Sequence, residues 1–370
     1  MVIEDLALLF IRGLGSRGIV HLIDHFGTAE EIYSAPLHTL INQAGLRKDV
    51  AERIVAREGM QEAKREIEYC RKNQIYPIAA TDEEYPEALR ETSDRPHVLF
   101  ARGNIKALNM RTLSMVGTRE ASPSGIHSAD KIIAGLATQI PNLCFISGLA
   151  YGIDSACHRS ALAHNATTVA VVADILPNVS PAPNRNLADE ILRMGGAIVS
   201  ELHSQTKQNG QLFIARNRIV AGMADAVVVV ESKKKGGSLI TADMAVDYAR
   251  DVFALPGRVD DICSAGCNDL IKRNKAQLIE HADDLILAMQ WQDITRKQPL
   301  QTTLIEMTCQ LSNTQQLLLQ LLREADEGLH INQIVMETQL AYHVVASELV
   351  MLELQDVVKS MPGGMWRTKK

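Results

Sequence analysis

Between residues 111 and 256 the sequence repeats short apolar runs that are separated by loops and amphipathic stretches. The runs are continuous rather than alternating, and they lie at 113–116, 143–146, 168–172, 197–199, 226–230 and 252–255. Continuous apolar runs of this kind suit strands that are buried on both faces. Their alternation with helical patterning predicts right-handed βαβ crossovers and an α/β fold with a doubly wound, Rossmann-like parallel sheet.

The first 72 residues have helical periodicity instead. Apolar residues recur at spacings of three and four, as at Ile19, Leu22, Ile23 and Phe26. The segment Ile11-Arg12-Gly13-Leu14-Gly15 resembles the hairpin of a helix-hairpin-helix unit, whose backbone N–H groups can hold a phosphate. Since the pattern occurs once, a glycine turn between two packed helices is the favoured interpretation.

The C-terminal part of the sequence predicts a winged-helix-like layout. Three candidate helices at 314–325, 331–338 and 341–354 are followed by a β-like pair at 356–360 and 365–368. A polar stretch precedes them. We therefore expect an N-terminal helical domain (1–72, SAM-like or helix-hairpin-helix-like), a Rossmann-like domain (73–290), a linker (291–305) and a winged-helix-like domain (306–370).

Composition places the chain among ordinary soluble globular proteins. It has 370 residues, of which 46% are hydrophobic and 22% charged, and no apolar run is long enough to span a membrane. The apolar stretch 6–11 follows two acids and ends at Arg12, which is the wrong charge order for a signal peptide, so we expect a cytoplasmic protein. Cys263 and Cys267 have no second pair with zinc-like spacing nearby, so we expect no metal site.

Three loops that follow predicted strands combine glycine with a hydroxyl or basic residue, and each precedes a helix. They are Gly117-Thr118-Arg119-Glu120, Ser147-Gly148-Leu149-Ala150-Tyr151-Gly152 and Lys233-Lys234-Lys235-Gly236-Gly237-Ser238. Glycine lets the backbone approach a phosphate, and a helix N-terminus supplies free N–H groups and partial positive charge. Ligands of open parallel sheets bind at the carboxyl ends of the strands. The three loops therefore predict a phosphate-lined groove.

A further segment, Phe213-Ile214-Ala215-Arg216-Asn217-Arg218, offers what a single strand of nucleic acid needs. Arg216 or Arg218 can pair with a phosphate, and Phe213 presents a flat surface for a base. Alternatively Phe213 belongs to the core and the arginines are solvated surface. The net charge of −6 argues against nucleic acid, because phosphate binding usually requires a basic surplus. Binding must therefore depend on locally concentrated charge.

Several blocks resemble the signatures of the DprA/Smf family, in the order in which that family has them. They are Ile146-Ser147-Gly148-Leu149-Ala150-Tyr151-Gly152-Ile153-Asp154, Arg216-Asn217-Arg218-Ile219-Val220-Ala221-Gly222, Gly236-Gly237-Ser238-Leu239-Ile240-Thr241-Ala242 and Leu255-Pro256-Gly257. Gly117-Thr118-Arg119 stands where the family usually has Gly-Ser-Arg. The similarity covers about residues 75–285.

This resemblance implies an extended Rossmann fold that binds and protects single-stranded DNA, forms a homodimer and loads RecA recombinase in natural transformation. It implies neither an enzyme nor a cofactor. The residues expected to bind nucleic acid are Gly117, Thr118, Arg119, Ser147, Gly148, Phe213, Arg216, Asn217, Arg218, Lys235, Gly236, Gly237 and Ser238. Because the sequence departs from the family at 174–176 and 180–184, we assign no DNA contact to the 174–186 loop.

Two enzyme classes are the alternatives. Gly236-Gly237-Ser238 resembles part of the Gly-Gly-x-Gly-Thr loop of phosphoribohydrolases, which act on nucleoside monophosphates. Those enzymes carry a glutamate shortly afterwards, whereas here Leu239-Ile240-Thr241-Ala242 is followed by Asp243. A dinucleotide-dependent oxidoreductase needs Gly-x-Gly-x-x-Gly after the first strand, and residues 117–125 lack that spacing.

Two acidic positions invite a catalytic interpretation. Asp154 and His158 are four residues apart, but a helix-start acid after the Gly152 turn with a histidine packed beside it explains them better. Glu231 follows a predicted strand and adjoins three lysines, so it could hold a loop or bind ribose. The sequence does not decide between these two roles.

The winged-helix-like segment is acidic. Residues 306–370 carry eight acidic and five basic residues, and the helix expected at 341–354 has only Glu348 and Glu353 as charged side chains. A duplex reader normally has a basic recognition helix. We therefore expect this domain to contact protein or to support a dimer.

Overall fold

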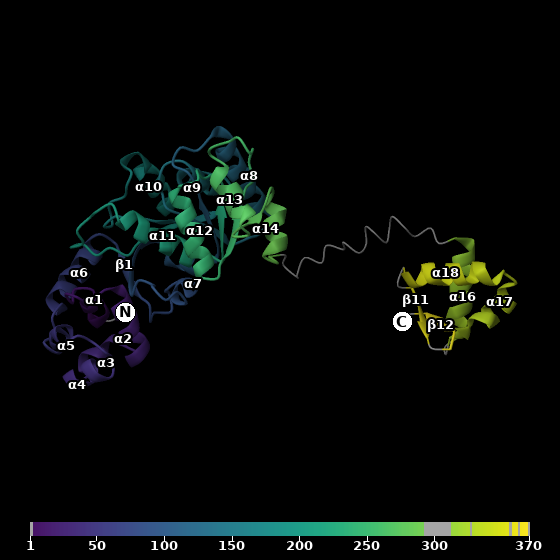
Figure 1. Cartoon of the computed structure of the whole chain (residues 1–370), viewed down its shortest axis with the longest axis horizontal. Helices are drawn as coiled ribbons and strands as arrows, with labels where there is room; N and C mark the ends of the chain where they lie inside the picture. The colour runs from purple at the N-terminus through teal and green to yellow at the C-terminus, as the bar shows by residue number, and fades with distance from the viewer. Residues whose placement is uncertain (1–2, 292–311, 326–327, 355–356, 362, 369–370) are drawn as a thin grey trace. The chain divides into compact units, whose positions relative to one another are not determined.

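The computed structural model describes residues 3–291, 312–325, 328–354, 357–361 and 363–368. The chain forms two compact units, Met1–Gln292 and Asp293–Lys370 (Figure 1). The linker expected at 291–305 lies outside the described residues, apart from Trp291. Of the described helices, none has the length and apolar character that crossing a membrane would require.

In the described part of the first unit, nine strands form one sheet in the order β1-β2-β6-β5-β4-β3-β7-β8-β9. They are β1 (Tyr76–Ala79), β2 (Val98–Gly103), β3 (Arg111–Val116), β4 (Leu143–Ser147), β5 (Thr167–Val171), β6 (Ala197–Ser200), β7 (Ala226–Val229), β8 (Asp251–Ala254) and β9 (Gln277–Leu278). Strands β3 to β9 are parallel, and β2 joins β6 antiparallel. The doubly wound parallel sheet is thereby confirmed.

The chain winds outward from β3 in both directions. It runs through β4, β5 and β6 on one side and returns through β7, β8 and β9 on the other. The six apolar runs correspond to β3–β8, whereas β1, β2 and β9 were not predicted. The reversal of winding between β3 and β7 opens a crevice at the carboxyl ends of the strands, where such sheets bind ligands.

Helices cover both faces of the sheet (Figure 1). One face packs on α8 (Pro123–Gln139), α9 (Ile153–Ala163) and α14 (Ala282–Ala288). The other packs on α7 (Glu87–Arg90), α11 (Leu212–Gly222), α12 (Gly237–Asp247) and α13 (Ala265–Lys272). Successive residues of β3 alternate between the two cores, with Leu113 and Met115 in one and Val116 in the other.

The N-terminal helices belong to the same compact unit as the sheet. They are α1 (Ile3–Leu8), α2 (Ser16–Phe26), α3 (Ala29–Ser34), α4 (Leu37–Asn42), α5 (Lys48–Val55) and α6 (Met60–Lys72). Their core includes Leu6 and continues into Phe100 of β2 and into α10 (Arg185–Arg193). Glu66 of α6 is 1% exposed, and its carboxylate accepts the Ser204 N–H at 2.9 Å and the Ser204 hydroxyl at 2.5 Å. The N-terminal helices thereby fix the loop between β6 and α11.

The glycine pair at the N-terminus forms a turn between two helices. Gly13 lies in the left-handed region with φ of 88°, and Gly15 is the N-cap of α2. Leu14 between them is buried in the helical core. The described contacts of this turn are thus those of a packed connection.

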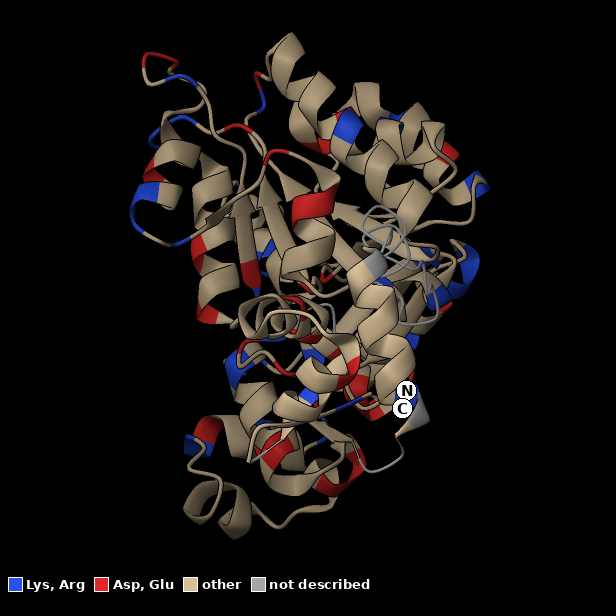
Figure 2. Ribbon diagram, turned by 90° about the vertical axis from the view of Figure 1, so that its right-hand side faces the viewer, with Lys and Arg blue, Asp and Glu red and all other residues tan. Residues whose placement is uncertain are grey.

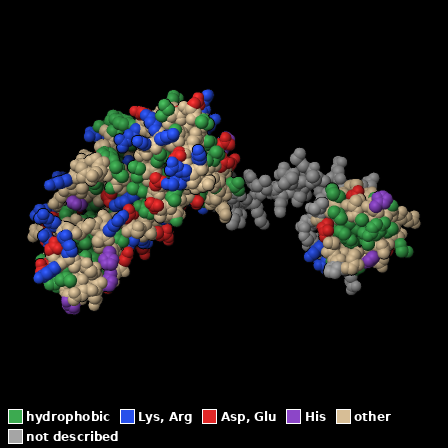
Figure 3. All heavy atoms as spheres, viewed as in Figure 1, with side chains coloured by type: hydrophobic (Ala, Val, Ile, Leu, Met, Phe, Trp, Pro, Cys, Tyr) green, Lys and Arg blue, Asp and Glu red, His purple; other side chains and the backbone are tan. Residues whose placement is uncertain are grey.

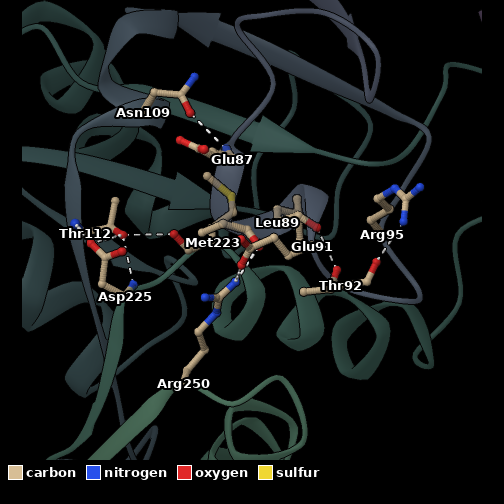
Figure 4. Close-up of polar contacts among 11 residues, drawn as sticks. Glu87, Leu89, Glu91, Thr92, Arg95, Asn109, Thr112, Met223, Asp225 and Arg250 are labelled. Atoms are coloured by element: carbon tan, nitrogen blue, oxygen red, sulfur yellow. Dashed lines mark hydrogen bonds and ion pairs between the residues drawn. The ribbon is translucent and has the colours of Figure 1, made fainter.

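The amino ends of the strands are joined by polar contacts within the protein (Figure 4). The Thr112 N–H donates to Asp225 at 2.7 Å, and Arg250 donates to the Ala88 carbonyl at 2.5 Å. The Asn109 side chain accepts the Glu87 N–H at 3.0 Å. These groups connect β3 and α7 with the residues that directly precede β7 and β8, so they serve the fold at the edge opposite the predicted groove.

The second unit has the winged-helix layout. Its described elements are α16 (Asn313–Glu324), β10 (Leu329–His330), α17 (Ile331–Thr338), α18 (Tyr342–Leu354), β11 (Val358–Met361) and β12 (Met365–Thr368). The three strands pair antiparallel in the order β10-β12-β11 around a core that includes Leu318, Leu349 and Trp366. Hydrophobic side chains also gather on its visible surface (Figure 3). Among the exposed apolar residues of this unit, Met336 of α17 is 79% exposed.

Candidate nucleic-acid interface

The loops after β3, β4 and β7 meet at the crevice beside β3. They enclose, together with α11, a pocket of about 240 Å³ that we call the central pocket. Ten of the residues predicted to bind nucleic acid line it: Gly117, Thr118, Arg119, Gly148, Arg216, Asn217, Lys235, Gly236, Gly237 and Ser238. Loops from separate parts of the sequence therefore converge on one site.

The start of α12 provides the donors of the central pocket. The helix begins at Gly237, and its N-cap Gly236 has no side-chain capping bond. The Leu239 N–H donates to the Gly236 carbonyl, whereas the N–H groups of Gly237 and Ser238 have no partner among the described residues and remain available. Lys235 is exposed beside them, and it makes no ion pair with any residue that the structure describes. The Ser238 hydroxyl instead donates to Ser232 at 2.8 Å and supports the turn from within.

Arg216 of α11 lines the central pocket with a buried side chain. It is only 5% exposed, and its Nη1 donates to the Val171 carbonyl at 2.7 Å. A Cβ on Gly148 would overlap this Nη1, which explains the glycine in the loop after β4. The buried Nε has no hydrogen-bond partner among the described residues. Arg216 therefore joins α11 to the end of β5, packs against the loop after β4, and retains an unused donor.

Asp154, which also lines the central pocket, is the charge partner of Arg216. It accepts the Ala150 N–H at 3.4 Å in the first turn of α9. Burial raises the pKa of Asp154, and the positive charge of Arg216 opposes that rise. Burial lowers the pKa of Arg216, and Asp154 opposes it in turn. The two groups thus stabilise each other's charged forms in a place that water reaches poorly.

His158 packs beneath this pair as a neutral ring. Thr168 donates its single hydroxyl proton to the Phe145 carbonyl at 2.8 Å, so His158 Nδ1, 2.7 Å from that hydroxyl, must be the donor. Nε2 therefore carries no proton, and it is buried with no partner in the part of the chain that the structure describes. Burial and then Arg216 lower the pKa of His158 to about 3. The histidine is suited to packing rather than to proton transfer at neutral pH.

Acid should therefore destabilise the first unit through His158. The unfolded histidine binds a proton near pH 6.5 and the folded one only near 3, so stability is lost as the pH falls below 6.5. Between pH 8 and pH 5 this single group should cost about 2 kcal/mol. Urea unfolding at both pH values measures the loss, and His158→Gln should remove that share of it. An equally steep decline in the variant would contradict this assignment.

Phe213 lies at the surface rather than in the core. It is 38% exposed, and the Arg119 guanidinium lies 6.0 Å from the centre of its ring. Both residues line a smaller hollow of about 140 Å³, the aromatic slot, which Tyr151, Ser180 and Gly148 also border. A flat ring beside an arginine is the combination on which a base and its phosphate are held.

Two predicted residues lie elsewhere. Arg218 forms an ion pair with Glu201, and both side chains are largely buried, so it is neither solvated surface nor part of the central pocket. Ser147 is fully buried, and its hydroxyl donates to the Met115 carbonyl at 2.7 Å. These contacts direct both side chains into the protein.

Glu231 holds the loop after β3. Its carboxylate is 6% exposed and accepts the Ser122 N–H at 2.9 Å and the Ser122 hydroxyl at 2.5 Å. Ser122 is the N-cap of α8, and a Cβ on Gly125 would clash with the Glu231 carboxylate. Of the two roles left open by the sequence, the contacts match the loop-holding one.

Hydrogen bonds hold the 174–186 loop, both within the loop and to the loop after β4. Asp174 accepts the Ser180 N–H at 2.9 Å, and Asn184 donates to the Leu149 carbonyl at 2.8 Å. Asn184 thereby supports the glycine loop after β4. Ser180 and Pro181 of this loop border the aromatic slot. The sequence had given no reason to place this loop beside the proposed site, because it departs there from the family pattern.

Local charge differs from the overall balance. Figure 2 shows acidic and basic residues interspersed along the ribbon, so the net charge of −6 does not describe any one site. Lys233, which lines the central pocket, forms an ion pair with Glu120 at 2.6 Å. Arg119, Lys234 and Lys235 make no ion pair among the described residues, which leaves these cations for a ligand. No group of three or more His, Cys, Asp or Glu in the described ranges could hold a metal ion.

Comparison with known proteins identifies the family of the chain. Residues 77–290 match the family model of DNA recombination-mediator protein A, and residues 306–364 match the DprA winged helix domain. The DNA processing protein DprA of Streptococcus pneumoniae is 38% identical over 205 residues, which cover 55% of this chain and 71% of the relative. Protein Smf of Escherichia coli is 34% identical over 214 residues, which cover 58% of this chain and 56% of the relative.

Two solved structures are similar as well. The X-ray structure of DprA from Streptococcus pneumoniae has a TM-score of 0.67 and 31% identity, and the match covers 78% of this chain and 98% of that one. A DprA structure from Helicobacter pylori, described as showing a unique single-stranded DNA binding mode, has a TM-score of 0.53 and 27% identity over 59% of this chain and 96% of that one. The chain therefore belongs to the DprA/Smf family, the family of DNA recombination-mediator protein A.

Proposed function

We propose that this protein binds single-stranded DNA, with the backbone of the strand held in the central pocket. The observation that carries the proposal is the convergence on one crevice of three glycine-containing loops, an uncapped helix N-terminus and the exposed cations Arg119 and Lys235. Backbone N–H groups and guanidiniums bind phosphates without regard to base sequence. The single-stranded DNA binding mode described for the Helicobacter pylori relative supports the same class of ligand.

The aromatic slot favours a single strand over a duplex. Phe213 presents an exposed ring beside Arg119, and a ring can stack only on a base that is free of its partner strand. The slot has a volume of about 140 Å³ and is bordered by the Tyr151 ring as well as by Phe213. We infer that the protein holds the sugar-phosphate chain while one or more bases lie on aromatic side chains.

The biological role that follows is the protection and delivery of single strands. A strand whose phosphates are held in a groove is shielded from nucleases but remains open to a recombinase, so loading of RecA, with two grooves presented by a homodimer, fits this geometry. The acidic winged-helix unit is proposed to contact protein. Its exposed Met336 and the charge balance of residues 306–370 support this role over duplex reading.

A non-enzymatic function is part of the proposal. A phosphoribohydrolase needs a free acid beside the ribose, whereas Asp154 is coupled to Arg216 and Glu231 is bonded to Ser122. These two carboxylates near the central pocket thus have structural partners. The proposed activity is binding, and it requires no cofactor.

Fluorescence anisotropy with the full-length protein tests this proposal. Labelled oligo-dT and a duplex of the same length are titrated at two salt concentrations. We expect tighter binding of the single strand and a steep weakening as salt rises, because phosphate contacts release counterions. Equal affinity for the two ligands, or no binding of oligo-dT at low salt, would overturn the proposal. Incubation with AMP, followed by a search for released adenine, checks the enzymatic alternative.

A further inference from the structure

A third hollow adjoins the central pocket on the side of α8 and α9. It has a volume of about 870 Å³, and we call it the lateral pocket. Arg119 lines the lateral pocket, the central pocket and the aromatic slot, and Tyr151 lines the lateral pocket and the aromatic slot. The lateral pocket is therefore continuous with the proposed DNA site through these two side chains.

The walls of the lateral pocket are largely apolar. Pro123 and Ile126 come from α8, Ala156 and Ala163 come from α9, and Ile126 is 45% exposed. Tyr151 also lines the pocket, from the short loop between β4 and α9, and it is 48% exposed. An exposed aromatic ring above an apolar wall is the surface that a nucleobase covers favourably.

The charges around the lateral pocket distinguish a base from a phosphate. Glu120 and Asp130 line it together with Arg119 and Arg159, so the two carboxylates offset the two arginines and leave no surplus of positive charge to draw a phosphate into the interior. Asp130 accepts hydrogen bonds from Ser160 and from His164, the latter at 3.1 Å, and these contacts favour its ionised form. Arg159 at the same pocket is exposed and forms no ion pair among the described residues. The interior therefore suits an uncharged base, while the phosphates of the DNA strand stay near Arg119 and Arg159.

We propose that the lateral pocket is a second base-binding subsite, in which the Tyr151 ring stacks on a base of the same strand whose phosphate Arg119 holds. This inference rests on the proposed function. Arg159 then contacts the next phosphate along the strand. Phe213 and Tyr151 receive bases that flank Arg119, so the site extends across the loops after β3 and β4 rather than ending at the aromatic slot.

Tyrosine variants with oligo-dT of increasing length test the subsite in the full-length protein. Tyr151→Ala should weaken binding of a long oligo-dT roughly tenfold, since stacking on one aromatic side chain contributes about that much. Tyr151→Phe keeps the ring and should bind like the original protein. Tyr76→Ala is the matched control, because Tyr76 is also exposed, at 54%, and lies on β1 away from the three pockets. Wild-type affinity of Tyr151→Ala, or an equal loss in Tyr151→Phe, would overturn the proposal.

A second measurement separates stacking from a general disturbance of the loop. A single abasic nucleotide is moved along the oligo-dT, and the affinity is measured at each position. In the original protein, one position beside the principal binding register should lose affinity about tenfold, and that loss should vanish in Tyr151→Ala. The same abasic loss in both proteins would refute the subsite. The proposed function fails separately, because its failure is seen in the original protein, as absent binding of oligo-dT or as equal affinity for oligo-dT and the duplex.

Discussion

Replacing Arg216 by methionine should lower the free energy of unfolding by about 1–3 kcal/mol, which is the cost of leaving a buried polar group without its partner. Methionine matches the length of the arginine stem, so the expected loss is mainly electrostatic. Asp154 would remain buried without its counter-charge, and the Val171 carbonyl would lose its donor. Urea unfolding at pH 7, followed by circular dichroism, measures the change.

The pH dependence of this loss has a definite sign. Burial already raises the pKa of Asp154, and removal of Arg216 raises it further. The folded variant then holds a proton that the unfolded chain releases, so its deficit should be smaller at pH 5 than at pH 7. Adding Asp154→Asn to Arg216→Met should restore much of the stability. A deficit that is unchanged by pH and by the second substitution would show that Arg216 acts by packing alone.

Arg119→Ala should weaken binding of oligo-dT by roughly ten- to a hundredfold, because a hydrogen bond to a charged group contributes about 1.5–3 kcal/mol. Arg119 is exposed and forms no ion pair among the described residues, so the fold should be unaffected. The loss should be similar for oligo-dC, since a phosphate contact carries no base information. Anisotropy titrations at several salt concentrations should also give a slope that is smaller by about 0.7.

Arg193→Ala is the control for this measurement. Arg193 is the last residue of α10 and precedes β6, at the edge of the sheet opposite the central pocket. Its side chain is 72% exposed and forms an ion pair with Glu190. It removes the same charge from the protein without touching the central pocket. Equal affinities and salt slopes for the Arg119 variant and the original protein would eliminate the site as described.

The central strands were predictable because burial on both faces leaves a strong trace in the sequence. Continuous runs such as 226–230, repeated in alternation with helical stretches, favour a strand enclosed by two helical layers. β1 gave no such trace, because it has four residues, includes Pro77, and pairs with β2 at the antiparallel edge. β2 does carry a continuous buried run at 98–101, but it was not predicted because it precedes the alternating pattern of residues 111–256. β9 has two residues, which is too short for any periodicity.

At the site, the loops were predictable and the directions of the side chains were not. Parallel strands bring their carboxyl ends to one edge, so the three glycine loops had to meet. Arg216 and Arg218 look equivalent in sequence, yet two residues on a helix point about 200° apart, so one guanidinium enters the central pocket and the other meets Glu201. Helical spacing from Phe213 to Arg216 and Asn217 was the signal that could have separated them.

The Glu66–Ser204 contact has a consequence for how affinity and folding are linked. The loop that it anchors leads into α11, which carries Phe213, so any loosening of the N-terminal helices reaches the proposed base-stacking ring through a covalent path of a few residues. Because the N-terminal helices already order this loop, binding of a strand does not have to provide the free energy for ordering it. The N-terminal helices, which contribute no residue to the central pocket, thereby help to preorganise the proposed DNA site.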